Sequence, residues 1–351
     1  MRQHKISING RKIGADHPPY IIAELSANHH GTMDTAIASI HAAKKAGADA
    51  IKLQTYTADT MTLNKRSAEF MIDDGLWAGR NLYELYQQAH TPWDWHPILF
   101  ETAAKLGITL FSSPFDTTAV DLLEALNTPA YKIASFEITD LPLIAYIAQT
   151  QKPMIISTGM ASEEEIEEAV ATAKDKGCKA LAVLHCVSAY PAPAKDYHLQ
   201  TLRHMSKKFG AVVGLSDHTL GLTTAICSIA CGASIVEKHF TIDRSAGGPD
   251  DSFSIEPDEL HTLCQQATVA WEALGQVNYG RKSSEQTNLK FRRSLYFVRD
   301  MQQGESISAD HIRSIRPGFG LAPKYIDALI GKKVNRDIQS GTAVQWTLVD
   351  D

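Results

Sequence analysis

The sequence has little of what secreted, membrane-spanning or zinc-binding chains contain. Its 351 residues include five cysteines, at positions 178, 186, 227, 231 and 264, and no Cys-x-x-Cys pair. The odd count and wide spacing indicate neither a disulfide framework nor a structural zinc site. Residues 1–5 carry no apolar stretch, so we expect no secretory signal. No run of about 18 apolar residues occurs, so we expect no membrane partner and a location in the reducing cytoplasm.

Clusters of positive charge are also missing. The formal net charge is -6, and the basic residues form no block. Nucleic acid is therefore not expected as a partner. The chain is 44% hydrophobic and 21% charged, which is typical of a globular protein. Its length suits one large domain and a smaller one.

Eight short apolar runs are present, and nearly all end in charged or hydroxyl residues. They cover residues 20–25, 50–56, 109–115, 130–135, 153–159, 181–187, 212–218 and 235–241. Near-continuous apolar runs are typical of buried parallel strands. Helical patterns separate them, such as 34–46 before Gly47 and a capping box at Ser162 and Glu165. The pattern predicts an α/β fold, a (β/α)8 TIM barrel with its chemistry at the carboxyl ends of the strands.

The remaining segments predict the domain organisation. Residues 4–13 read as a hairpin with a turn at Asn9-Gly10, placed where it could close the bottom of the barrel. Residues 57–108 hold a long insertion, which is either a lid over the site or a surface excursion. We expect the barrel domain to span 1–280, a polar linker 281–291, and a small second domain 292–351.

Two histidines at the ends of the last two strands suggest a metal site. His218 and His239 occupy equivalent positions on strands that are neighbours in a closed barrel, and two imidazoles can bind one transition metal. Because successive side chains on a strand face opposite ways, Glu237 shares a face with His239, whereas Asp217 and His218 do not share one.

Lysines and hydroxyls form a second group at the strand ends. Lys52, Lys132, Ser135, Ser157 and Ser216 suit a phosphate or carboxylate ligand. A lysine paired with a nearby glutamate, or a lysine that forms a Schiff base, remains an alternative. Glu24 and Glu137 are both candidates for the general base, and spacing alone does not choose between them. The residues therefore indicate a metal-assisted enzyme acting on an anionic carbonyl or phosphorylated substrate.

Several motifs resemble the sialic acid synthase family. They are Ile22–His29, Ile51–Thr55, Phe111–Phe115, Tyr131–Ser135, Ile156–Met160, Gly214–His218 and Val236–Phe240. Residues Phe291–Ser294 and Arg316–Gly320 resemble the family's antifreeze-like (SAF) domain. Within the family, Glu24–His29, together with the segments Leu76–Tyr83 and Thr91–His96, is similar to the pseudaminate branch.

This resemblance implies condensation of phosphoenolpyruvate (PEP) with an open-chain amino sugar and release of phosphate. The family's metal ligands, for Mn2+ or Mg2+, fall on His218 and His239, and its catalytic groups on Glu24, Glu137 and Lys132. Its PEP contacts fall on Lys52, Lys132, Ser135, Ser157, Ser188 and Ser216. Gln54, Asp250 and Arg316 fall at sugar-binding positions, with Arg316 reaching the partner's site in a domain-swapped homodimer. The pseudaminate branch would suggest a role in flagellin glycosylation or in surface polysaccharide.

Three rival functions remain open from the sequence. One is the same chemistry on N-acetylmannosamine or the legionaminic acid precursor. Another is a pyruvate-dependent aldolase with Lys132 as a Schiff base. The third is a SAF module that binds glycans or ice beside an inert barrel. The polar residues at nearly all of the strand ends argue against an inert barrel.

Overall fold

The computed structural model describes residues 4–350 of the chain. It divides into two compact units, of which one ends at Gly275 and the other begins at Gln276. Within the described residues, no helix is both long and apolar enough to cross a membrane.

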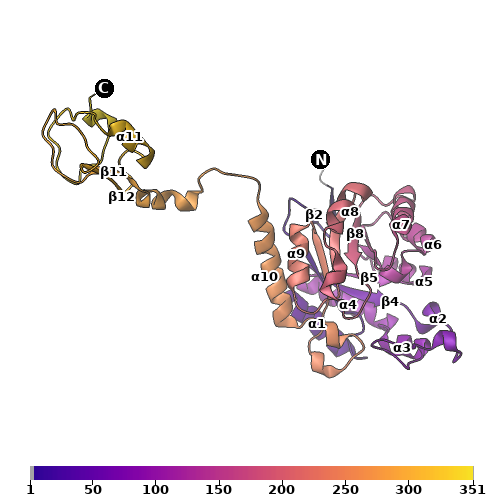
Figure 1. The fold of residues 1–351 in the computed structure, drawn as a ribbon. Helices are drawn as coiled ribbons and strands as arrows, with labels where there is room; N and C mark the ends of the chain where they lie inside the picture. The colour runs from indigo at the N-terminus through magenta and orange to yellow at the C-terminus, as the bar shows by residue number, and fades with distance from the viewer. Residues whose placement is uncertain (1–3, 351) are drawn as a thin grey trace. The chain divides into compact units, whose positions relative to one another are not determined.

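The first unit contains a closed barrel of eight strands, as the sequence predicts (Figure 1). The strands are β3 (Tyr20–Glu24), β4 (Ala50–Thr55), β5 (Thr109–Pro114), β6 (Tyr131–Ile133), β7 (Met154–Ser157), β8 (Leu181–Cys186), β9 (Val212–Asp217) and β10 (Ile235–His239). Neighbours pair in parallel in chain order, and β10 closes the barrel against β3 with His239 opposite Glu24. All strand ends that carry candidate residues therefore meet at one end of the barrel.

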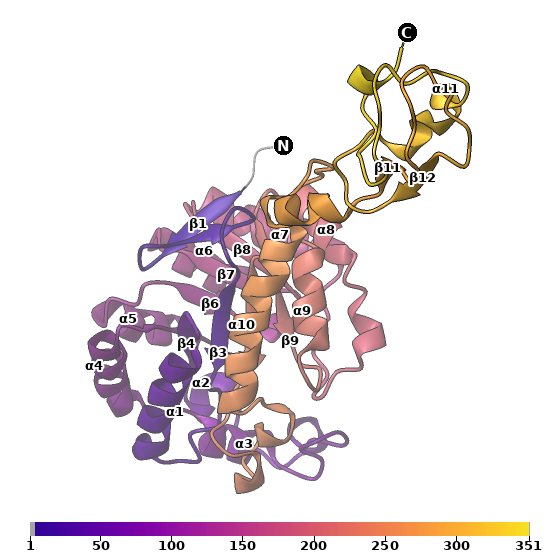
Figure 2. The same ribbon diagram turned by 90° about the vertical axis from the view of Figure 1, so that its left-hand side faces the viewer.

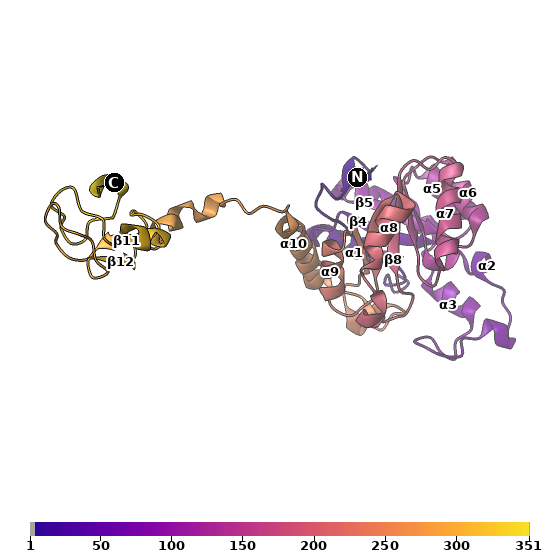
Figure 3. The ribbon, with the colours of Figure 1, turned by 45° about the horizontal axis from the view of Figure 1, so that its top comes forward.

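Helices cover the outside of the strands. They are α1 (Met33–Ala46), α4 (His96–Leu106), α5 (Thr117–Ala125), α6 (Leu141–Gln149), α7 (Glu163–Asp175), α8 (Thr201–Phe209), α9 (Thr223–Ala230) and α10 (Pro257–Leu274). The consecutive helices α5, α6 and α7 lie side by side on one flank (Figure 1, Figure 3). Gly47 ends α1 with φ 97°, and Ser162 with Glu165 forms the predicted capping box of α7. As predicted, Gly47 ends α1, and Ser162 with Glu165 begins α7.

An N-terminal hairpin closes the end of the barrel opposite the candidate site. Its strands are β1 (Lys5–Ile8) and β2 (Arg11–Gly14), which pair antiparallel around the Asn9-Gly10 turn. Ile8 and Ile13 are fully buried and belong to one apolar cluster with Tyr20 and Ala50, the first residues of β3 and β4. The expectation that the hairpin fills the bottom of the barrel is confirmed.

The insertion after β4 folds at the other end of the barrel (Figure 2). It contains α2 (Ala58–Met61) and α3 (Leu82–Ala89), with a short 3-10 helix at Ala68–Phe70 between them. Asn81 caps α3 through its side-chain oxygen. Its amide nitrogen donates to the carbonyls of Lys65 (2.7 Å) and Phe70 (3.2 Å). One buried side chain thereby holds three parts of the insertion together.

The second unit has its own small core. Strands β11 (Ser294–Phe297) and β12 (Ile312–Ile315) pair antiparallel, and α11 (Ile326–Leu329) packs beside them. Ser283–Phe291, within the segment predicted as a linker, forms consecutive 3-10 turns. Leu295, Phe297, Leu329 and Val344 are fully buried in the core of this unit.

Candidate active site

The barrel brings together all the candidate residues of the first unit. Glu24, Lys52, Gln54, Lys132, Ser157, Ser216 and His239 lie in barrel strands, while Ser135, Glu137, Ser188, His218 and Asp250 lie in the loops that directly follow them. Arg316 lies in the second unit, directly after β12, and its side chain is exposed.

Lys52 is the centre of a buried ionic network. Its Nζ lies 2.9 Å from Glu24 Oε2 and donates to Ser113 Oγ at 3.2 Å. Burial acts to lower the pKa of this ammonium, but the carboxylates of Glu237 and Glu24 outweigh burial and raise it. Lys52 is therefore a fixed positive charge at the floor of the site.

Glu237 also belongs to this network, although it was not among the candidate site residues predicted from the sequence. Its Oε1 lies 3.7 Å from Lys132 Nζ and its Oε2 3.8 Å from Lys52 Nζ, while Ser216 Oγ donates to Oε1 at 3.2 Å. Burial would raise the pKa of Glu237, but the two lysines hold it below its ordinary value. Burial lowers the pKa of Lys132, because the pull of Glu237 does not outweigh it and the charge of Lys52 acts in the same direction as burial. Glu24, by contrast, has a raised pKa because burial outweighs the pull of Lys52.

A second chain of contacts runs from the network to the histidines. Gln54 Nε2 donates to Glu24 Oε1 and to Ser26 Oγ, each at 2.9 Å. Ser26 Oγ in turn donates to Asp250 Oδ2 at 2.5 Å, and that oxygen lies 3.7 Å from His239 Nδ1. The predicted sugar-binding residues Gln54 and Asp250 are thus joined through a serine that sequence reasoning did not select.

Three candidate serines lie at or near Gly159, and one of them has an unsatisfied hydroxyl. Gly159 N donates to Ser135 Oγ at 3.1 Å, and a Cβ at Gly159 would lie 2.1 Å from Ser188 Oγ and 2.8 Å from Ser135 Oγ. Only glycine therefore fits at position 159, because any side chain there would clash with the two hydroxyls. The buried Ser157 Oγ has no hydrogen-bond partner in the described structure. Such an orphaned hydroxyl is costly unless a ligand satisfies it.

The two histidines adjoin at the mouth of the barrel, with ring centroids 5.3 Å apart. His218 Nδ1 lies 2.8 Å from the carbonyl oxygen of Val187. We assign the proton to this nitrogen, which leaves Nε2 free to act as a ligand. His239 Nδ1 is buried without a hydrogen-bond partner, and burial lowers the pKa of this ring well below its ordinary value, so it is neutral.

The two imidazoles fit a divalent ion, which each would bind in its neutral form and whose other ligands are water or substrate oxygens. Among residues 4–350, no group of three or more His, Cys, Asp or Glu side chains is arranged to hold a metal by itself. Asp217 and Lys238, the neighbours of the two histidines, form a buried ion pair at 3.0 Å instead. The predicted alternation of faces is thus confirmed for Asp217.

Tyr190 is another residue that sequence reasoning missed. Its ring lies 4.4 Å from that of His218, 5.2 Å from Phe253 and 5.7 Å from Trp77. It follows β8 in a loop without periodicity, so no pattern marks it in the sequence. In the structure, Tyr190 forms a side wall of the site beside the two histidines.

A cavity of about 380 Å³ opens above these residues. Gln54, Ser135, Glu137, His239 and Asp250 line one part of it. The insertion lines another part with Met61, Ile72, Trp77, Leu82, Leu85, Tyr86 and Ala89. Of the two interpretations of the insertion, the structure supports a cover over the site rather than a remote surface excursion.

Glu137 lies on the wall of this cavity, half-buried, and its Oε2 has no hydrogen-bond partner. Burial raises the pKa of this carboxyl to about 7, although Lys132 acts in the opposite direction. A carboxyl that titrates near neutral pH can both accept and return a proton in one catalytic cycle.

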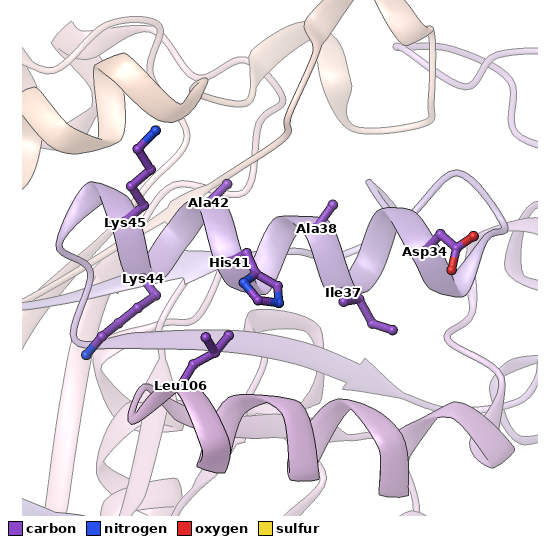
Figure 4. A pocket seen from close by; sticks show the side chains of 8 residues that line it. All are labelled: Asp34, Ile37, Ala38, His41, Ala42, Lys44, Lys45 and Leu106. Carbon is purple, nitrogen blue, oxygen red and sulfur yellow. The ribbon is translucent and has the colours of Figure 1, made fainter.

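A second hollow lies on the outside of the barrel along α1 (Figure 4). It is lined by Asp34, Ile37, Ala38, His41, Ala42, Lys44, Lys45 and Leu106. Lys44 is already bonded to the Gly107 carbonyl at 2.8 Å. This hollow gathers no strand-end residues, so the cavity over the barrel mouth is the candidate active site.

Comparisons with known proteins identify the family to which the chain belongs. The model of the NeuB family matches residues 39–279, and that of the SAF domain matches residues 292–350. A curated pseudaminic acid synthase from Campylobacter jejuni is 44% identical, over 94% of this chain and 96% of its own length. One from Helicobacter pylori is 42% identical, over 93% and 96%. The crystal structure of an N-acetylneuraminic acid synthetase from Leptospira borgpetersenii has a TM-score of 0.73 at 32% identity, over 83% of this chain and 96% of that one.

Proposed function

Because the chain belongs to the NeuB family of sialic acid synthases, we propose that it is a pseudaminic acid synthase. The reaction is condensation of PEP with 2,4-diacetamido-2,4,6-trideoxy-L-altrose and water, with release of phosphate, which makes the enzyme a transferase. The observation that carries this proposal is the 44% identity to a curated pseudaminic acid synthase over nearly the whole of both chains. We place the reaction in the cytoplasm, where the five unpaired cysteines of the chain would stay reduced.

PEP binds in the buried floor of the site. Lys52 and Lys132 neutralise its phosphate and carboxylate, and Ser135, Ser157, Ser188 and Ser216 donate hydrogen bonds to them. The orphaned hydroxyl of Ser157 and the crowding of Ser135 and Ser188 around Gly159 support this assignment. The sugar lies above PEP, in the cavity lined by Gln54, Glu137 and Asp250.

His218 and His239 would hold the divalent ion, Mn2+ or Mg2+. When bound, such an ion polarises the aldehyde of the sugar and orients it toward PEP. The histidines support this role because they are adjacent, one is fixed by Val187, and the other has a buried nitrogen without a partner.

The reaction adds the sugar and water across the double bond of PEP and then eliminates phosphate. A bond forms between C3 of PEP and the aldehyde carbon, which leaves positive charge at C2. Glu24 orients the water that adds at C2 and takes its proton, and Glu137 donates a proton to the aldehyde oxygen of the sugar, which becomes a hydroxyl. The tetrahedral intermediate expels phosphate by cleavage of the C–O bond, and Lys52 and Lys132 stabilise the charge that develops on phosphate.

Product analysis tests this mechanism. PEP carrying ¹⁸O in the bridging position should yield phosphate that contains the label, because the C2–O bond breaks. Label retained in the sugar acid would show P–O cleavage and would contradict the proposal.

One observation favours a second candidate, an aldolase that uses Lys132 as a Schiff base. Burial lowers the pKa of Lys132, and a lysine must lose its proton to attack a carbonyl. Borohydride with pyruvate would trap such an enzyme covalently. The proposed synthase should not be trapped, and its PEP turnover should survive the treatment.

We also propose that the active form is a homodimer in which Arg316 of one subunit completes the sugar site of the other. The loop that carries Arg316 is held firmly: Ser294 Oγ donates to the Pro317 carbonyl at 2.7 Å and accepts from Gly320 N at 2.9 Å. This loop exposes Phe319. The loops after β6, β7 and β9 expose Phe136, Met160 and Leu220, and exposed apolar side chains favour association.

A further inference from the structure

The cavity has two walls of opposite chemistry. The wall formed by strand ends presents amide, hydroxyl, carboxylate and imidazole groups, from Gln54, Ser135, Glu137, His239 and Asp250. The other wall is formed by the apolar side chains of Met61, Ile72, Leu82 and Leu85 from the insertion and of Phe115 after β5, with the rings of Tyr56 and Tyr86 beside them. We call this second set the apolar wall.

The apolar wall is held in place by the barrel. Tyr56, directly after β4, lies edge-on to Phe115 (5.1 Å) and to Tyr86 of α3 (5.8 Å). Trp77 Nε1 donates to the carbonyl oxygen of Pro249 at 3.1 Å, which ties the tip of the insertion to the loop after β10. Because Asn81 also fixes the start of α3, the wall is a preformed surface.

A fully hydroxylated sugar would fit such a wall poorly. A hydroxyl pressed against it finds no donor or acceptor among Met61, Ile72 and Leu85, and an unsatisfied buried hydroxyl is costly. A methyl group in the same place gains by leaving water. The sugar of the proposed reaction carries three methyl groups, one at C6 and one in each acetamido group.

We propose that the apolar wall is a subsite for the methyl groups of the sugar, and that residues 58–90 thereby select a 6-deoxy sugar over its 6-hydroxy counterpart. This inference rests on the proposed function, and it adds the element that sets sugar specificity. Met61 and Ile72 make the wall selective by offering no hydrogen bond at that position.

The test compares the 6-deoxy diacetamido sugar with its 6-hydroxy analogue, in the full-length protein with PEP and Mn2+. The wild type should prefer the 6-deoxy sugar by about 10- to 200-fold in kcat/KM, the range for one small group in an apolar pocket. Met61→Gln, which nearly conserves volume, and Ile72→Thr, which replaces the ethyl branch of isoleucine with a hydroxyl, should each shrink that preference by about threefold or more. The KM for PEP should not change, because PEP lies in the floor of the site.

Leu63→Gln is the matched control. Leu63 lies two residues from Met61, is 61% exposed and does not line the cavity, so its substitution should leave the preference at the wild-type value. Thermal unfolding confirms that each variant is folded. Preferences for both wall variants equal to those of Leu63→Gln would overturn the inference.

Calorimetric binding of the two sugars separates this inference from the proposed function. Absence of phosphate release with either sugar would contradict the proposed function. The apolar wall would still be supported if the 6-deoxy sugar bound more tightly and the two wall variants lost that difference. Equal affinity for the two sugars, or binding of neither, would overturn the subsite.

Discussion

Glu237 lies between Lys132 and Lys52, 3.7 Å from the first ammonium and 3.8 Å from the second. The three side chains are almost completely buried. One carboxylate therefore holds two positive charges apart at the floor of the site and keeps them in place before an anionic substrate arrives.

Glu237→Gln should destabilise the protein, because it leaves two buried ammonium groups without their shared counter-charge. Removal of one partner of a buried ion pair typically costs about 3–5 kcal/mol, and the hydrogen bond from Ser216 that glutamine can still accept places the loss at the lower end. Chemical denaturation measures it. Glu167→Gln is the control, since Glu167 pairs with Lys208 on the surface and its substitution should change stability little. Equal effects would show that the buried carboxylate has no special role.

Lys132→Ala should weaken the use of PEP by about ten- to a hundredfold, since a hydrogen bond to a charged group contributes about 1.5–3 kcal/mol. Steady-state kinetics with PEP varied at saturating sugar would measure it. An unchanged KM and kcat for PEP would contradict the role given to this lysine.

The sequence predicts the barrel well because each parallel strand is a continuous apolar run that ends in polar residues. Lys52 and His239 follow from that rule alone. Glu237 also lies at a strand end, but its role does not follow from the rule, because that role depends on closure of the barrel, which brings β10 near the lysines of β4 and β6. Tyr190, Ser26 and the apolar residues of the insertion come from loops, where no periodicity shows which side chain turns toward the cavity.

Glu137→Gln should remove a pH-dependent loss of stability. Burial raises the pKa of Glu137 from 4.5 to about 7, so the folded protein favours the protonated carboxyl. The stabilisation is present below pH 4.5 and is lost as the pH rises through 7. The variant should therefore match the wild type near pH 4.5 and exceed it by about 1–2 kcal/mol at pH 8. Denaturation midpoints at pH 4.5, 6 and 8 measure the difference; a constant offset across this range would contradict it.

EDTA should abolish turnover, and Mn2+ should restore it in the wild type. His218→Ala and His239→Ala should each lose most activity and bind Mn2+ more weakly in calorimetry, because each removes one of two imidazole ligands. His41→Ala is the control, since His41 is exposed on α1 outside the barrel. Unchanged Mn2+ affinity in both site variants would show that the metal binds elsewhere.

Mixed dimers test the exchange of Arg316 between subunits. Arg316→Ala and His239→Ala should each be nearly inactive alone. Subunits mixed and allowed to exchange should regain activity, because one barrel in each mixed dimer then combines an intact His239 with an intact Arg316 from its partner. Absence of recovery in dimers shown to be mixed would place Arg316 in the site of its own chain or outside any site.

Phosphate release from PEP with different sugars is the most direct measurement of the central claim. With Mn2+, the enzyme should be offered 2,4-diacetamido-2,4,6-trideoxy-L-altrose, the legionaminic acid precursor and N-acetylmannosamine in separate reactions, each repeated with EDTA. The account predicts release with the altrose sugar alone and none after EDTA. Release with another sugar in preference to it, or release that survives EDTA, would contradict the account.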